Sequence, residues 1–153
     1  MGKINLGRVI LGGIVAGIVI NLFEAVSNTV VLDKQFADAM AALGRSPVTS
    51  VKQIVAFNVW GFAAGIVMVW LYAAIRPRFG AGPRTAMLAG GAVWALAYAS
   101  SNAAMVFLHL FPLGLMLAAT AIGLVETLVA GLAGAAVYKE EASGTAKSSA
   151  ANA

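Results

Sequence analysis

Four long apolar stretches run through this chain, and almost no charge interrupts them. A transmembrane helix needs about 20 predominantly apolar residues to cross the hydrocarbon core of a bilayer. The stretches that meet this requirement are residues 9–32, 54–75, 85–108 and 113–137. Barrel strands would be about 10 residues long with strict alternation, whereas these stretches are long and unbroken. The sequence therefore predicts an all-α integral membrane bundle of four transmembrane helices.

The composition excludes the common soluble classes. Of the 153 residues, 61% are apolar and 10% are charged, whereas soluble domains carry about 25% charged residues. The absence of cysteine rules out disulfides and thiolate metal sites. We expect residues 1–141 to form one transmembrane domain. Residues 142–153 are small and polar, and we expect them to form a disordered cytoplasmic tail.

The distribution of lysine and arginine predicts the orientation. Cytoplasmic loops of membrane proteins carry an excess of these residues. Four spans would place seven of them on the side of both termini and three on the opposite side, which predicts that both ends are cytoplasmic. The first group is Lys3, Arg8, Arg76, Arg78, Arg84, Lys139 and Lys147, and the second is Lys34, Arg45 and Lys52. The net charge of +4 suits a membrane lipid partner, and three loop arginines do not indicate nucleic-acid binding.

The N-terminus has an alternative interpretation as a signal peptide. Lys3 and Arg8 precede an apolar run that leads to the small residues Ala25-Val26-Ser27. The apolar run continues beyond them, however, and the charged Glu24 lies in what would be the cleavage region. We therefore expect a retained membrane span.

Each predicted span has one face of small and polar residues. At 100° per residue, the face of the first span lies within an arc of about 80°. Glycines four residues apart allow close helix contact, and the polar residues surround a carboxyl group. The faces comprise Gly13, Gly17, Asn21, Glu24 and Asn28; Asn58, Gly61, Gly65 and Tyr72; Gly91, Ala95, Tyr98 and Asn102; and Ala119, Gly123, Glu126, Thr127, Ala130 and Gly134.

Two acids, Glu24 and Glu126, lie inside the predicted spans, where no lysine or arginine accompanies them. Helix rise places them about 12 and 20 Å below the outer surface. An ionised carboxylate at such depth costs a few kcal/mol or more. We expect both acids to be protonated at neutral pH unless a cation or bound water offsets that cost. The predicted proton- or ligand-binding set is Glu24, Glu126, Asn21, Asn28, Asn58 and Asn102. Each asparagine alone is more typical of interhelical hydrogen bonding.

No catalytic set, metal site or cofactor site is predicted. The chain has one histidine, His109, which cannot supply two axial haem ligands and is most simply an interfacial residue. The connection 33–52 carries Phe36, Met40 and Leu43 at helical spacing. It therefore predicts a short amphipathic helix, lying either on the membrane surface or as a lid over the bundle.

Two segments carry a resemblance to known proteins. One runs from Val69 to Gly80 as VWLYAAIRPRFG and continues through Gly82-Pro83 and Thr85-Ala86. The other opens the chain as LGRVILGG, followed by Asn21 and Glu24. Together they resemble small bacterial four-span inner-membrane proteins of unassigned function. The resemblance implies a bacterial inner membrane and implies no activity.

Three functional hypotheses remain open. The first is binding or translocation of a proton, a small cation or an amphipathic ligand in a polar cavity in the outer half of the bundle. The second is a non-catalytic accessory or assembly subunit, because glycine-rich faces favour a homo-oligomer or a partner membrane subunit. The third is an enzyme acting on a lipid or isoprenoid, which requires the two acids to meet in one pocket.

Overall fold

The computed structural model describes residues 4–47 and 50–139, and all regular secondary structure within them is helical. The all-α prediction is therefore confirmed. The segments η1 and η2 are stretches of π-helix, which is wound wider than an α-helix. In chain order the elements are α1 (Leu6–Val26), η1 (Ser27–Val31), α2 (Asp33–Ala42), α3 (Val51–Phe79), α4 (Pro83–Trp94), η2 (Ala95–Ser100), α5 (Ser101–Phe107) and α6 (Leu113–Val137).

Three helical stretches are long and apolar enough to cross a membrane, which makes this a membrane protein. They are Leu6–Val31, Val51–Phe79 and Leu113–Val137, and their bounds lie within four residues of the predicted ones. The remaining predicted span, 85–108, is helical throughout most of its length. It is divided, however, because η2 separates the 12 residues of α4 from the 7 residues of α5. The count of four spans thus stays a prediction.

Local signals explain where α3 begins and ends. The Ser50 hydroxyl accepts a hydrogen bond from the Gln53 amide, and the Gln53 side chain accepts one from the Ser50 amide. This capping box extends the helix before the predicted span. Pro77, which the sequence placed outside a span, lies inside the last part of α3. The helix ends only where Gly80 takes a φ of 85°.

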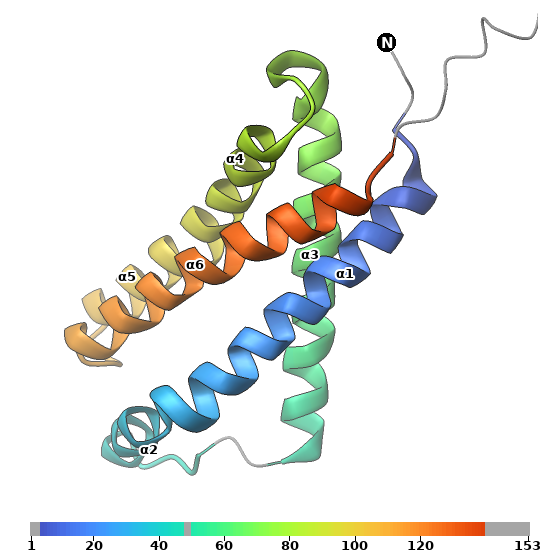
Figure 1. Cartoon of the computed structure of the whole chain (residues 1–153). Helices are drawn as coiled ribbons and strands as arrows, with labels where there is room; N and C mark the ends of the chain where they lie inside the picture. Colours follow the sequence, from blue (N-terminus) through green and yellow to red (C-terminus); the bar gives the residue numbers. More distant parts are fainter. Residues whose placement is uncertain (1–3, 48–49, 140–153) are drawn as a thin grey trace, which may run out of the picture.

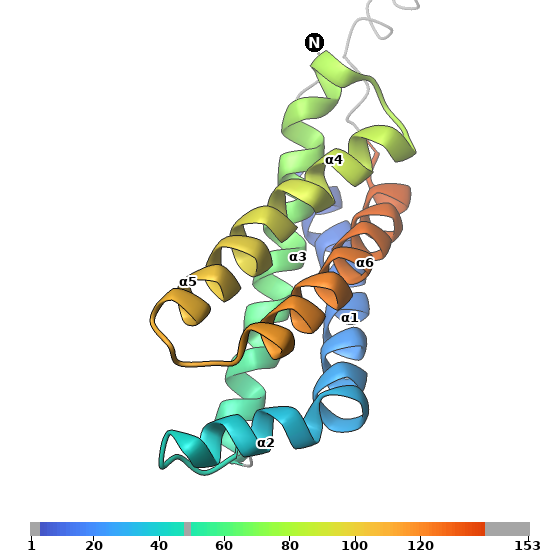
Figure 2. The ribbon, with the colours of Figure 1, turned by 90° about the vertical axis from the view of Figure 1, so that its left-hand side faces the viewer.

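Helices α3 and α6 each contact both of the other long helical segments of the bundle. Helix α1 packs on α3 and α6, and α4 packs on α3 and α6. Figure 1 shows α1 and α6 side by side with α3 crossing behind them. The start of α1, the α3–α4 connection and the end of α6 lie at one end, which we call the terminal end. Helix α2 and the α5–α6 connection lie at the other, which we call the α2 end (Figures 1 and 2).

Glycines bring the helices into backbone contact in the half of the bundle near the terminal end. A Cβ atom at Gly13 would lie 2.5 Å from the Cα atom of Ile66, and one at Gly12 would lie 2.6 Å from the carbonyl oxygen of Gly134. A Cβ at Gly65 would collide with the backbone of Gly13 and Gly17. The surrounding core is apolar and consists of Val9, Ala16, Ile20, Met68, Val69, Tyr72, Ala73, Ala86, Ala89, Ala130 and Tyr138. This half therefore leaves little space between its helices.

Helix α2 lies across the α2 end of the bundle, as Figure 2 shows. Its Phe36 ring packs edge-on against Phe111, with ring centroids 6.0 Å apart. A second apolar cluster forms here from Leu32, Ala39, Leu115 and Met116. On the exposed side, Lys34 donates a 2.6 Å hydrogen bond to Asp38, which raises the pKa of Lys34. These contacts place α2 against the end of the bundle, and the choice between a lid and a helix on the membrane surface stays a prediction.

The glycine contacts predict the effect of adding a methyl group. Gly65→Ala forces backbone atoms apart, and we expect it to lower the free energy of unfolding by about 1–3 kcal/mol. Gly91→Ala is the matched control because nothing lies within 4 Å of the added Cβ atom. It should leave stability unchanged or raise it by up to about 1 kcal/mol through helix propensity. Unfolding in mixed detergent micelles measures both, and equal effects of the two variants would contradict the prediction.

Candidate functional site

The two acids of the bundle meet at one tyrosine. Helix α1 carries Glu24, α6 carries Glu126, and η2 carries Tyr98. The Tyr98 hydroxyl lies 2.8 Å from Oε1 of Glu126 and is also hydrogen-bonded to Oε1 of Glu24. Side chains from three separate elements thus form one bridge, in which the phenol joins the two carboxyl groups.

The hydrogen count of this bridge limits its charge. A phenol has a single hydrogen to donate, and an ionised carboxylate can only accept. For both bonds to be made with linear geometry, Tyr98 must donate to one carboxyl and accept from the other. The second carboxyl must then carry a proton, whereas the first can accept in either its ionised or its protonated form. A fully bonded bridge therefore contains at least one protonated glutamate and has a net charge of 0 or −1.

Asparagines hold the surroundings of the bridge in place. Asn28 donates a 2.6 Å hydrogen bond to Oε2 of Glu24 and a 2.9 Å bond to the backbone oxygen of the same residue. Asn102 donates to the Thr120 hydroxyl at 2.9 Å, and that hydroxyl donates to the carbonyl of Met116. Because Asn28 and Tyr98 bond to different oxygens of Glu24, the orientation of this carboxyl group is fixed at both atoms.

A cavity of about 180 Å³ adjoins the bridge. This volume has room for several water molecules or one small ligand. Its walls come from the α1–η1, α2, η2–α5 and α6 segments. The lining residues are Glu24, Ser27, Asn28, Leu32, Phe36, Tyr98, Asn102, Ala119, Ile122, Gly123 and Glu126. Four polar or acidic residues of the wall belong to the predicted set, and no lysine or arginine among the described residues lines it.

The packing tightens on the terminal side of the bridge. The Tyr98 ring lies on Gly123, where an added Cβ atom would be 2.5 Å from a ring carbon. One turn further along α6, Glu126 and Thr127 are each only 1% exposed. Thr127 uses its hydroxyl within the helix, donating to Gly123 at 2.8 Å. The bridge therefore lies between the cavity and the glycine-packed half of the bundle.

Four of the six predicted site residues line the cavity, and two do not. Glu24, Glu126, Asn28 and Asn102 are brought together. Asn21 instead donates to the backbone oxygen of Asn58 at 3.2 Å, and Asn58 donates within its own helix to Ile54. These two asparagines lie where α1 meets α3, in the interhelical role that the sequence analysis left open for them.

Tyr98 is the principal residue missing from the predicted set. It was assigned to an inward face together with Asn102, four residues later, but not to the site. The sequence does not reveal either π-helical segment, although η1 contributes Ser27 and Asn28 and η2 contributes Tyr98. Such segments occur often at functional sites. Serine and threonine hydroxyls bond back to carbonyls nearby, as Thr29 does to Ala25 and Ser100 does to Leu96.

A metal centre has no support in the described part of the chain. No group of three or more potential histidine, cysteine or acidic metal ligands occurs there. His109 lies in the α5–α6 connection with a φ of 56°, is exposed, and does not line the cavity. The bridge therefore presents hydrogen-bonding and charge chemistry through two carboxyls and a phenol.

Comparison with known proteins adds no assignment, since no protein family, curated protein or solved structure matches the chain.

Removing the bridging hydroxyl should destabilise the protein. Tyr98→Phe keeps the ring on Gly123 but leaves a carboxyl atom without its partner, which costs about 1–3 kcal/mol. Tyr138→Phe is the matched control, because its hydroxyl accepts one long bond of 3.4 Å from Asn5. We expect the control to change the free energy of unfolding by less than about 1 kcal/mol. The same micelle-based unfolding measurement applies, and a Tyr98→Phe value no larger than the control would refute the bridge.

Proposed function

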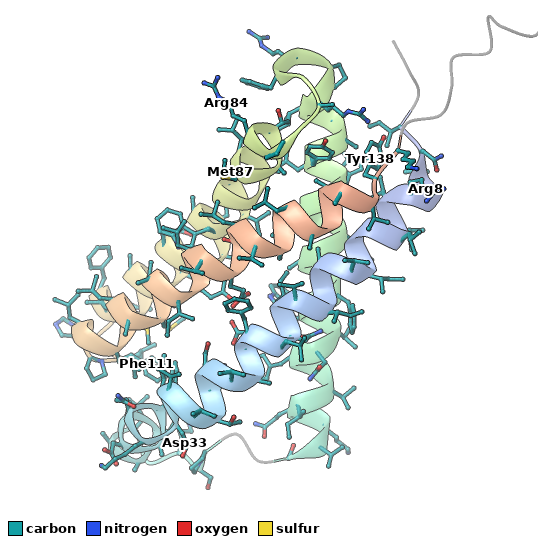
Figure 3. All side chains as sticks on the ribbon, viewed as in Figure 1. Arg8, Asp33, Arg84, Met87, Phe111 and Tyr138 are labelled. Atoms are coloured by element: carbon teal, nitrogen blue, oxygen red, sulfur yellow. The ribbon has the colours of Figure 1, made fainter. Side chains whose placement is uncertain are left out.

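We propose that the chain crosses the membrane four times with both ends in the cytoplasm. Besides the three shown spans, Pro83–Phe107 forms a further continuous helical segment beside α6. An even number of crossings accounts for the start of α1 and the end of α6 lying at the same end (Figure 1). Arg8 and Arg84 lie at that end, and Asp33 lies at the other (Figure 3). The excess of basic residues supports a cytoplasmic terminal end.

The membrane in this proposal is the bacterial inner membrane. The support is the resemblance of the Val69–Gly80 segment and the N-terminal segment to small bacterial four-span proteins. The predicted tail at 142–153 lies outside the described residues and contributes nothing to the argument.

Single cysteines test the number of crossings, since the chain contains no native cysteine. We expect Arg45→Cys and His109→Cys to react with an impermeant maleimide added outside intact cells. Ala81→Cys should react only after the membrane is opened. These three positions are exposed. If Pro83–Phe107 does not cross, Ala81 and His109 will be labelled from the same side, which contradicts the proposal.

We propose further that the cavity binds an exchangeable proton or small monovalent cation at the bridge of Glu24, Tyr98 and Glu126. The observation that carries this is the joining of two carboxyl groups by a single phenol in the wall of the cavity. With one of its carboxyls ionised and both bonds made, the bridge carries one negative charge. Because no basic side chain among the described residues lines the cavity, a cation from outside the protein would supply the compensating charge.

The size of the cavity favours a small ligand. Pockets for drug-sized molecules occupy about 300–1,000 Å³, whereas this cavity measures about 180 Å³. The two acids do meet in one pocket, as the enzyme hypothesis requires, but the space is too small to enclose an isoprenoid chain. Because the terminal half is closely packed, this conformation supports binding at the bridge but no passage through the bundle. Translocation would require a second conformation that opens that half.

Proton release on cation binding tests this function. The purified protein in nanodiscs of neutral lipid would be titrated in weak buffer with sodium, potassium, methylammonium and guanidinium chlorides. We expect at least one cation to release up to one proton per chain in a saturable manner, because the cation replaces one proton of a bridge in which both carboxyls are protonated. The remaining proton keeps both bonds of the bridge, and the net charge stays at zero. A pH-sensitive dye follows the release, and isothermal calorimetry follows the binding.

Three variants make this titration specific. Glu24→Gln and Glu126→Gln each remove one carboxyl of the bridge and should abolish the release. Asp33→Asn is the matched carboxyl-to-amide control, because Asp33 is exposed and does not line the cavity. Absence of release from the unmodified protein, or release that persists in both glutamine variants, would exclude the proposed function.

A second candidate function is that of an accessory subunit in a membrane complex, either with another protein or as a homo-oligomer. The first ten residues of α3, numbers 51–60, are all exposed, including Phe57 and Trp60 at 63% and 72%. A helix surface this exposed suits contact with a neighbouring subunit as well as lipid. Native mass spectrometry after gentle solubilisation decides this, and a monomer without partners would reject it.

A further inference from the structure

A second hollow lies at the terminal end, away from the acid bridge. It has a volume of about 380 Å³ and is lined by Arg78, Phe79, Arg84, Thr85 and Leu88. The first two residues end α3, and the last three begin α4. The hollow thus follows directly from the way the chain turns between these two helices.

The turn that shapes this hollow is fixed by hydrogen bonds. Thr85 is buried, and its hydroxyl donates to the carbonyl of Gly80 at 2.7 Å. The Gly82 amide donates to the hydroxyl of Tyr72 at 3.3 Å. Gly80 and Gly82 both have positive φ angles, which glycine adopts without strain. The two arginines are therefore held on either side of one hollow by an ordered connection.

The two arginines differ from their neighbour Arg76. The guanidinium of Arg76 lies over the Tyr138 ring at 5.7 Å. Arg78 and Arg84 are exposed, and neither side chain makes a hydrogen bond or ion pair within the described residues. The described acids lie elsewhere: two at the bridge and two on α2. The N-terminus of α4 adds a partial positive charge beside the same hollow.

The level of the hollow suits a lipid headgroup. Two residues that line the hollow are apolar and exposed, Phe79 at 57% and Leu88 at 46%. Figure 3 shows Met87, also exposed, on α4 directly beyond Arg84. An anionic phosphodiester would place its charge between the guanidinium groups, which match phosphate geometry with paired N–H donors. Its acyl chain would lie along the apolar residues.

We propose that the hollow between α3 and α4 binds the phosphate of an anionic phospholipid through Arg78 and Arg84. Basic pockets between helices on the cytoplasmic side of a membrane favour such headgroups. The site is separate from the acid bridge, so its success or failure does not depend on the proposed cation binding.

Native mass spectrometry of the intact chain tests this site. The protein would be released from nanodiscs of phosphatidylcholine containing increasing fractions of phosphatidylglycerol, and the retained lipid would be counted. We expect phosphatidylglycerol to be retained selectively. The double variant R78Q/R84Q should weaken its retention roughly tenfold or more, because each arginine near the surface contributes to anionic lipid binding.

Two further variants separate this site from general charge effects. R45Q/K52Q removes two positive charges near the α2 end and should retain phosphatidylglycerol like the unmodified protein. R78K/R84K keeps both charges but not the paired N–H donors, and it should recover part of the binding, which also shows that the hollow tolerates substitution. Equal retention in R78Q/R84Q and the unmodified protein, or an equal loss in R45Q/K52Q, would overturn the proposal.

Soluble phosphate provides the last arm of the test. Inorganic phosphate and glycerol phosphate, added at millimolar concentration, present the same charged group without acyl chains. We expect them not to displace phosphatidylglycerol, since they cannot contact Phe79 and Leu88. Displacement by either compound would overturn the assignment to a lipid and indicate a site for free phosphate.

Discussion

Two carboxyl groups within an apolar helical bundle have to be stabilised by hydrogen bonds when no basic side chain is near. Here Tyr98 provides this stabilisation for Glu24 and Glu126 together, and Asn28 supports the first of them. Unpaired buried charge is costly in a low-dielectric environment, so the bridge is favourable only when all three elements are in register. The position of α1 relative to α6, and the winding of η2, are therefore coupled to the protonation of this site.

The rest of the bundle is organised around that polar layer. Apolar core residues lie on both sides of the bridge along the chain, as Ile20 and Leu32 do around Glu24 and as Met116 and Ala130 do around Glu126. Toward the terminal end the helices meet through glycines and leave little space between them. Toward the α2 end the side chains are larger, the helices lie further apart (Figure 1), and a cavity remains. Small residues thus provide close packing in one half, and polar residues provide the site in the other.

The sequence predicted the parts of this arrangement that depend on helix periodicity and hydropathy. Long apolar runs located α1, α3 and α6, and the helical projection placed Glu24 and Asn28 on one face. Periodicity could not show which neighbouring helix each part of that face contacts. Asn21 was therefore grouped with the cavity, although it contacts α3. Nor could it reveal η1 and η2, because hydropathy and periodicity do not distinguish a π-helical turn from an α-helical one. The role of Tyr98 follows from that winding together with the glycine at position 123, and both become informative only in three dimensions.

The contrast between the two ends also determines where exchange with the bridge can occur. Opening the terminal half requires the separation of backbones that touch at Gly12, Gly13 and Gly65, together with the surrounding core. Opening the α2 end separates fewer buried residues. Ala39 is the only buried residue within the described helix α2, and the Phe36 ring of this helix packs edge-on against Phe111. Segments with few buried apolar contacts open at low free energy. Under the proposed function, a proton or small cation would reach Glu24 and Glu126 past α2 rather than through the glycine-packed half.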